Sequence, residues 1–181
     1  MSHETYPVEI AGVKRNLRLM EVAPGVRIAV LNILGDTELT QAAAEALARQ
    51  LPQAAEFLVT AEAKSIPLAY ALAVASGLPY IVLRKSYKPY MGDALSAETL
   101  SITTNKPQTL FLDEKDREAI KGKHVVLVDD VISTGSTLQG MRLIMQKAGA
   151  EVIAEAAILT EGDRAKWTSV IALGHLPVFV S

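Results

Sequence analysis

The fold is decided by residues 125–137, which read Val-Val-Leu-Val-Asp-Asp-Val-Ile-Ser-Thr-Gly-Ser-Thr. Four consecutive apolar residues predict a strand that is buried on both faces, as in a parallel sheet. Two carboxylates follow the strand, then small hydroxyl residues around Gly135, and then apolar residues at helical spacing. Ligands of open α/β sheets bind beyond the carboxyl ends of the strands. The stretch therefore predicts a binding site as well as a fold.

Each part of this stretch has a chemical use. A small-residue loop that leads into a helix offers backbone N–H groups and the positive end of the helix dipole to a phosphate. Gly135 lets the backbone approach, and four hydroxyls add donors, from Ser133, Thr134, Ser136 and Thr137. Asp129 and Asp130 would repel a phosphate but suit sugar hydroxyls, with a divalent cation nearby. We expect a site for a ribose 5-phosphate. The competing interpretation is a buried strand, a helix-capping Asp and a Ser-Gly turn.

This order of strand, acidic pair and hydroxyl loop resembles the phosphoribosyl pyrophosphate (PRPP) motif of the type I phosphoribosyltransferases. The resemblance covers about residues 24–165. It extends to the purine branch, which includes adenine and xanthine phosphoribosyltransferases and the PRPP-sensing domain of purine repressors. It implies an α/β fold with a mainly parallel twisted sheet flanked by helices and a flexible hairpin lid. It also implies one domain over residues 1–181, whose small hood comes from about 1–30 and 160–181.

The resemblance also implies roles for individual residues. Asp129 and Asp130 would be catalytic, would hold the ribose and would bind Mg²⁺ through the ribose or water. The 5′-phosphate would lie on residues 133–137. The pyrophosphate would be held by two groups that follow predicted strands, namely Glu62, Ala63, Lys64 and Ser65, and then Arg84, Lys85 and Lys88. A non-proline cis peptide is expected near residues 61–63. The competing interpretation of both groups is an ordinary loop with solvated cations.

Base recognition is less clearly marked. Val26, Arg27 and Val131 are the expected base-binding residues. Adenine-specific relatives continue from the Pro24-Gly25-Val26 turn with an aromatic residue and Arg-Asp, which this chain lacks. They also carry Glu-Tyr on the lid, where this chain has Thr103-Thr104 between predicted strands at 98–103 and 108–112. The loop at 161–164 either contacts the base or only turns the chain.

Composition excludes several classes of protein. The 181 residues carry a net charge of −2, so no basic surface for nucleic acid or membrane is indicated. The chain has no cysteine, which excludes disulfides and thiolate metal sites. No targeting segment or membrane-length apolar run is evident, and we expect a cytoplasmic protein.

The sequence therefore predicts a Mg²⁺-dependent purine phosphoribosyltransferase, most simply of the adenine type, which converts adenine and PRPP to AMP and pyrophosphate. Its partners would be PRPP, a purine base and a second copy in a homodimer. One alternative is a xanthine or other 6-oxopurine enzyme. Another is a non-catalytic PRPP-binding regulator, which the missing Glu-Tyr favours and the lack of room for a DNA-binding domain disfavours.

Overall fold

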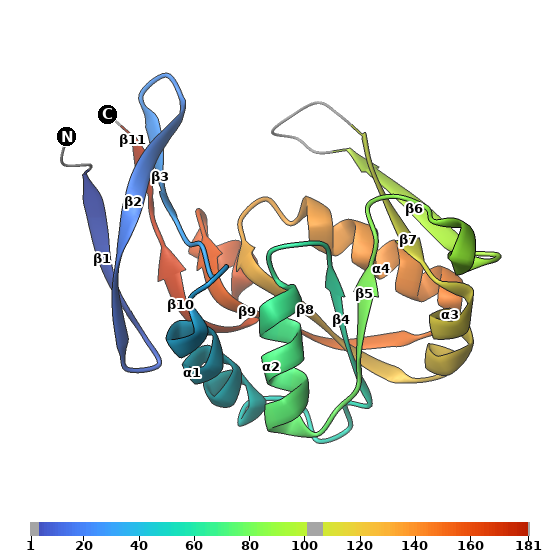
Figure 1. The fold of residues 1–181 in the computed structure, drawn as a ribbon. Coiled ribbons are helices and arrows are strands. Elements are labelled where there is room, and N and C mark those ends of the chain that lie inside the picture. Colours follow the sequence, from blue (N-terminus) through green and yellow to red (C-terminus); the bar gives the residue numbers. More distant parts are fainter. Residues whose placement is uncertain (1–3, 101–106, 181) are drawn as a thin grey trace.

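The computed structural model describes residues 4–100 and 107–180. Its main sheet has five strands in the order β10-β9-β8-β4-β5, and all neighbouring strands are parallel (Figure 1). These strands are β4 (Phe57–Ala61), β5 (Tyr80–Leu83), β8 (His124–Ile132), β9 (Glu151–Glu161) and β10 (Ile171–Leu176). The strand that carries the acidic pair, β8, is central. The predicted α/β fold with a parallel sheet is confirmed.

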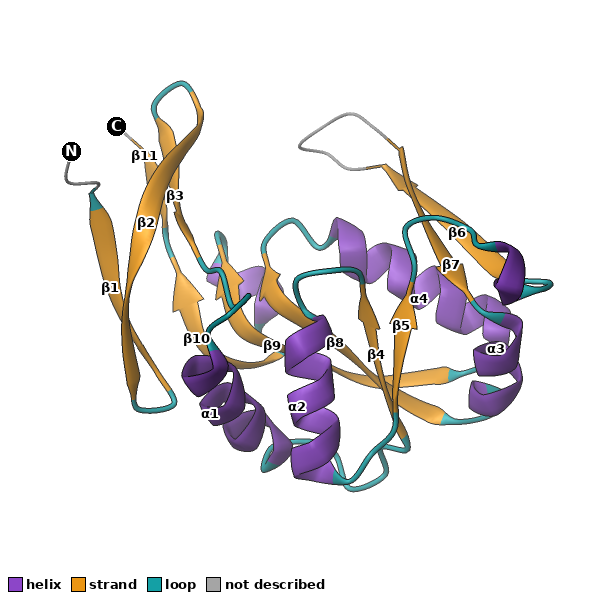
Figure 2. Ribbon diagram, in the orientation of Figure 1, coloured by secondary structure: helices purple, strands orange, loops and turns teal. Residues whose placement is uncertain are grey.

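Helices cover both faces of this sheet (Figure 2). One face packs on α1 (Thr37–Ala48) and α2 (Ile66–Ser76), and the other on α3 (Glu114–Ile120) and α4 (Ser136–Ala148). Strand β8 contributes to both layers, because Val126 and Val128 join the first cluster while Val125 and Leu127 join the second. All four are fully buried. A strand buried on both faces needs an unbroken apolar run, which is what the sequence provides.

A second sheet stands beside the main body at the place expected for the hood, and we call this sheet the hood (Figure 1). Its order is β1-β2-β3-β11, and its strands are β1 (Thr5–Ile10), β2 (Val13–Ala23), β3 (Val26–Val30) and β11 (Val178–Val180). We expected residues 160–181 to contribute to the hood, and of their strands only β11 lies in this sheet. Strand β10 instead pairs in parallel with β9, and its last residue, Leu176, is fully buried in the core.

A two-stranded hairpin lies on the far side of the site from the hood (Figure 1). It consists of β6 (Leu95–Leu100) and β7 (Pro107–Leu112), and a short 3₁₀ helix η1 (Pro89–Met91) precedes it. The first strand begins three residues earlier than predicted, because Ala97 pairs with Leu110 and both side chains are buried. The predicted strand positions 101–103, and Thr103-Thr104 with them, lie outside the described residues.

Local signals set the helix ends. Asp36 caps α1 by accepting a hydrogen bond from Leu39 N at 3.1 Å. Gly77 ends α2 in the left-handed conformation, with φ of 74°. Ser65 precedes α2, but its side chain makes no capping hydrogen bond to the helix. Its hydroxyl instead donates to Ala61 O at 3.3 Å, and Pro67 in the first turn has no N–H to offer.

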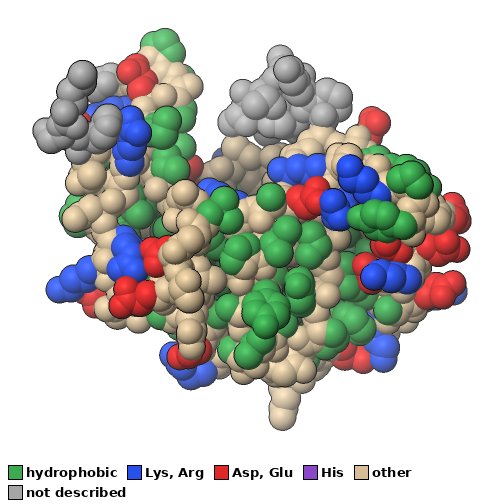
Figure 3. All heavy atoms as spheres, viewed as in Figure 1, with side chains coloured by type: hydrophobic (Ala, Val, Ile, Leu, Met, Phe, Trp, Pro, Cys, Tyr) green, Lys and Arg blue, Asp and Glu red, His purple; other side chains and the backbone are tan. Residues whose placement is uncertain are grey.

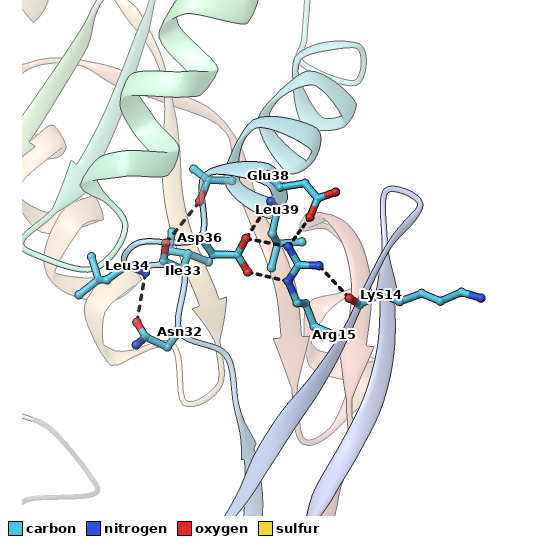
Figure 4. Close-up of polar contacts among 9 residues, drawn as sticks. Lys14, Arg15, Asn32, Ile33, Leu34, Asp36, Glu38 and Leu39 are labelled. Atoms are coloured by element: carbon cyan, nitrogen blue, oxygen red, sulfur yellow. Dashed lines mark hydrogen bonds and ion pairs between the residues drawn. The ribbon is translucent and has the colours of Figure 1, made fainter.

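Arg15 of β2 joins the hood to α1 (Figure 4). Its guanidinium donates to both oxygens of Asp36, at 2.7 and 2.8 Å, and to Glu38 at 2.7 Å. The hydrogen bond from Arg15 is the main reason why the pKa of Asp36 is lowered. The same carboxylate thus caps the helix and anchors the hood.

Among the helices that the structure describes, none combines the length and apolar character needed to cross a bilayer.

Candidate functional site

The site is an edge where the carboxyl ends of neighbouring parallel strands meet. Thr60 of β4 pairs with Val128 of β8, and Ala61 of β4 pairs with Leu83 of β5. The loops after β4, β5 and β8 therefore leave the sheet side by side, between the hood and the hairpin (Figure 1). Open α/β sheets bind their ligands at this edge.

The loop after β8 is shaped for an anion. It runs through Ser133, Thr134 and Gly135 into the first residue of α4, Ser136, so that N–H groups without a partner inside the helix lie at its start. Gly135 has a φ of 79°, which a side chain would strain. The hydroxyls of Thr134 and Ser136 lie 3.1 Å apart. Asp129 and residues 131–138 line one small cavity of about 40 Å³, so the structure brings Asp129 together with the predicted phosphate residues, while Asp130 is not part of this lining.

The two carboxylates differ in environment. Asp130 is 6% exposed, and its backbone N–H donates to Asp129 Oδ1 at 2.9 Å. Burial and, secondly, the negative charge of Asp130 raise the pKa of Asp129 to about 7. Asp130 is buried and Asp129 is partly buried, and a pair of acids in this state is stabilised by any cation or hydroxyl donor that binds to it.

Lys64 supplies one such cation. Its Nζ lies 2.9 Å from Asp130 Oδ2 and donates to the carbonyl of Leu31 at 2.8 Å. Leu31 follows hood strand β3, so one ammonium links the loop after β4, the acidic pair and the hood. The peptide bond between Glu62 and Ala63 in this loop is cis, as predicted. We expected Lys64 at the pyrophosphate; here it contacts the acidic pair.

The second cationic group lies at the same edge. Arg84 forms an ion pair with Glu62 and donates to the hydroxyl of Tyr90 at 2.9 Å. Glu62 also accepts from the backbone N–H of Lys85 at 2.8 Å. Glu62 therefore fastens the two strand-end loops to each other. The Lys85 side chain is exposed, while Lys88 precedes η1 and is partly buried. Their role in pyrophosphate binding stays a prediction.

The expected base-binding residues are spread over two elements. Val26 and Arg27 lie on β3 of the hood, where Arg27 donates to Glu4 at 2.5 Å. Val131 lies on β8 and pairs in register with Leu159 of β9. Arg27 thus has a structural partner in the hood, and its contact with a base stays a prediction. His124 lies at the opposite end of β8, beside Glu56 and Glu151, and so away from the candidate site.

Trp167 lies at the site but had no clear signal in the sequence. Trp167 ends the 3₁₀ helix η2 (Arg164–Trp167), and its Nε1 donates to Glu161 O at 3.1 Å. Its ring lies against the phosphate loop, because a Cβ on Gly135 would be 2.7 Å from Trp167 Cη2. The available clue was a lone tryptophan in a polar loop after a strand.

The donor set fits Mg²⁺ that arrives with a phosphate substrate. No group of three or more His, Cys, Asp or Glu side chains suited to a metal occurs in residues 4–100 and 107–180. Mg²⁺ commonly binds through one or two carboxylates together with substrate phosphates and water. Asp129 and Asp130 provide those carboxylates.

The fold defines a class, the α/β proteins with an open parallel sheet, which bind ligands beyond the carboxyl ends of the strands. Within that class, the family profile described as phosphoribosyl transferase domain matches residues 32–170. The chain belongs to this family.

Curated relatives include both enzymes and a regulator. A hypoxanthine/guanine phosphoribosyltransferase of Methanococcus voltae is 34% identical over 106 residues, which cover 59% of this chain and 53% of the relative. The purine biosynthesis transcriptional repressor PurR of Bacillus subtilis is 27% identical over 143 residues, which cover 78% and 49%. The chain thus spans about half the length of the curated relatives it matches.

Solved structures agree in fold. The adenine phosphoribosyltransferase of Thermoanaerobacter pseudethanolicus superposes with a TM-score of 0.67 at 20% identity, over 95% of each chain. The Giardia lamblia enzyme in complex with 9-deazaadenine gives 0.73 at 20% identity, over 88% of this chain and 93% of that one. At this identity the likeness concerns the fold alone.

Proposed function

We propose that this chain is a purine phosphoribosyltransferase that uses Mg²⁺ and PRPP. The observation that carries the proposal is the shared sheet edge, where the acidic pair 129–130 adjoins the loop 133–137 and the cation of Lys64. In the reaction N9 of the base bonds to C1 of PRPP and loses its proton. The bond from C1 to the pyrophosphate oxygen breaks, which yields a nucleoside 5′-monophosphate and pyrophosphate.

Each group at the edge has a task in this proposal. Backbone N–H groups and hydroxyls of residues 133–137 hold the 5′-phosphate. Asp129 and Asp130 accept hydrogen bonds from the ribose hydroxyls and balance positive charge that develops on the sugar. Lys64, Arg84 and Lys85 face the leaving pyrophosphate, which requires Lys64 to exchange its contact with Asp130. Bound Mg²⁺ would neutralise leaving-group charge as a Lewis acid.

We propose adenine as the base, with 6-oxopurines as the alternative. The adenine assignment agrees with the family branch that the sequence resembles. The names of the relatives favour the alternative, because several are hypoxanthine/guanine phosphoribosyltransferases.

A PRPP-binding regulator without catalysis is a second candidate function. The similarity to PurR over 143 residues favours it. It would use the same acidic pair and phosphate loop but form no nucleotide.

We also propose a homodimer. Tyr70 and Val74 of α2 and Tyr80 of β5 are exposed, and hydrophobic side chains gather over α2 (Figure 3). The rings of Tyr70 and Tyr80 pack edge to face with centroids 6.2 Å apart. A groove of about 880 Å³ lies between α1 and α2 beside them. Such an apolar face suits a second copy of the chain. Sedimentation of the wild type and of Val74→Glu would test this proposal.

One experiment separates the enzyme from the regulator. Protein, Mg²⁺ and PRPP are incubated with adenine, guanine, hypoxanthine or xanthine, and nucleotides are resolved by chromatography. We expect AMP. Binding of PRPP without a nucleotide from any base would favour the regulator, and no binding would contradict both functions.

A further inference from the structure

Tyr90 lies on the short helix η1, after the strand-end loop of β5, and its hydroxyl reaches back to Arg84 at the end of that strand. Arg84 Nη1 donates to this hydroxyl at 2.9 Å. The tyrosine is 69% exposed, so its ring is not held in place by burial. Within the described part of the chain, the bond to Arg84 is the one hydrogen bond that the Tyr90 side chain makes.

The turn that carries Tyr90 is itself fixed to the body of the protein. Met91, the last residue of η1, is 1% exposed, and its N–H donates to Lys88 O at 2.9 Å. The Tyr87 hydroxyl donates to Gly92 O at 3.1 Å, which holds the other side of the turn. A tyrosine on such a fixed turn can hold a mobile partner in one orientation.

The main chain of Arg84 is fixed as well. Its N–H donates to Phe111 O at 2.9 Å, and Phe111 N donates to Arg84 O at 2.8 Å. The ring of Tyr87 packs on the ring of Phe111, with centroids 6.2 Å apart. Since the backbone position is set by strand β7, only the side-chain torsions of Arg84 are left to orient its guanidinium.

The hydrogen bond to Tyr90 is the directional contact of this guanidinium. Arg84 Nε forms an ion pair with Glu62, but among the described residues it has no hydrogen-bond partner. Attraction between charges depends weakly on direction, whereas a hydrogen bond requires alignment. Because the guanidinium is planar, a bond at Nη1 and a charge beside Nε together fix its plane.

We propose that Tyr90 is a positioning residue, whose hydroxyl orients the guanidinium of Arg84 for the pyrophosphate group of PRPP. The inference rests on the proposed function, in which Arg84 faces the leaving group. A guanidinium recognises phosphate oxygens through parallel N–H groups, so its orientation contributes to affinity in addition to its charge.

The test compares Tyr90→Phe with the wild type and with Tyr87→Phe. Tyr87→Phe is the matched control, because it removes a neighbouring tyrosine hydroxyl that donates to Gly92 O instead of binding Arg84. Calorimetry in the presence of Mg²⁺ measures the Kd for PRPP and for ribose 5-phosphate, which lacks the pyrophosphate. Tyr90→Phe should raise the Kd for PRPP about 2- to 10-fold, the range of one lost hydrogen bond, and leave that for ribose 5-phosphate unchanged. Tyr87→Phe should bind both ligands like the wild type.

A second background shows whether Tyr90 acts through Arg84. In Arg84→Met, the further change Tyr90→Phe should leave the Kd for PRPP unaltered, because the guanidinium is already absent. An added loss in that background, or an equal loss for ribose 5-phosphate, would overturn the positioning role. So would wild-type affinity for PRPP in Tyr90→Phe alone.

The same measurements separate this inference from the proposed function. A PRPP affinity that depends on Tyr90 as expected, in a protein that forms no nucleotide from any base, would leave the positioning role intact and overturn the enzyme. Nucleotide formation with a Kd for PRPP that is indifferent to Tyr90→Phe would overturn the inference alone. A wild type that binds no PRPP would contradict both.

Discussion

Gly135→Ala tests the phosphate loop most sharply. Gly135 combines a φ of 79° with a neighbouring ring, since an added Cβ would lie 2.7 Å from Trp167 Cη2. Gly77 is the matched control, because its φ is 74° and an added Cβ would meet nothing within 4 Å. Alanine is strained by the positive φ at both positions. Only Gly135→Ala also displaces the loop or the ring.

The expected magnitudes differ accordingly. The left-handed conformation costs an alanine about 1–2 kcal/mol. A domain of this size should lose about 2–4 °C in Tm per kcal/mol, so Gly77→Ala should melt a few degrees lower. Gly135→Ala should lose at least as much. The displaced loop should also lose one charge-assisted hydrogen bond to the 5′-phosphate, which contributes about 1.5–3 kcal/mol. The Kd for PRPP should therefore rise about 10- to 150-fold.

The assay uses the tryptophan itself. Trp167 is the single tryptophan of the chain, and it lies on the loop, so its fluorescence should report PRPP binding in the presence of Mg²⁺. Gly77→Ala should bind PRPP like the wild type. Wild-type affinity in Gly135→Ala would refute the assignment of this loop to the phosphate.

Three further predictions concern acids. Asp130→Asn should lower turnover strongly while circular dichroism stays unchanged; unaltered steady-state kinetics would remove Asp130 from the mechanism. Asp36→Ala should lower the free energy of unfolding in urea by about 1–2 kcal/mol at pH 7, through the lost cap and ion pair. The pKa of Asp36 is lowered in the fold, so this gap should close as the pH falls below about 4; a constant gap would contradict the ion pair. The pKa of Asp129 is raised to about 7, so the fold holds a proton there that the unfolded chain releases near pH 4. The wild type should therefore lose stability relative to Asp129→Asn as the pH rises from about 4 to 7, and a flat difference would contradict the burial of that acid.

Local chemistry explains what the sequence could predict. The apolar run 125–128 fixed β8 at the centre of a parallel sheet, and the loop 133–137 with the helix after it was predicted where it is found. Asp36, Gly77 and Gly149 mark helix ends through their own side chains or their own φ angles, so short-range patterns were sufficient.

Long-range pairing explains what the sequence could not predict. Residues 171–176 read Ile-Ala-Leu-Gly-His-Leu, a pattern that does not tell one sheet from the other, whereas in the structure they pair with β9 and bury Leu176 in the core. The contact of Lys64 with Asp130 joins positions that are 66 residues apart. Trp167 reaches Gly135 only because η2 folds back over the loop. Such contacts leave no periodic signal along the chain.

The central claim is that the acidic pair and the hydroxyl loop together bind a phosphorylated ribose. Titration of PRPP with Mg²⁺ into the folded protein by calorimetry tests it most directly. The account predicts saturable heat with one site per chain, and a marked loss of affinity in Asp130→Asn. The absence of heat from a folded wild type, or equal affinity in that variant, would contradict the account.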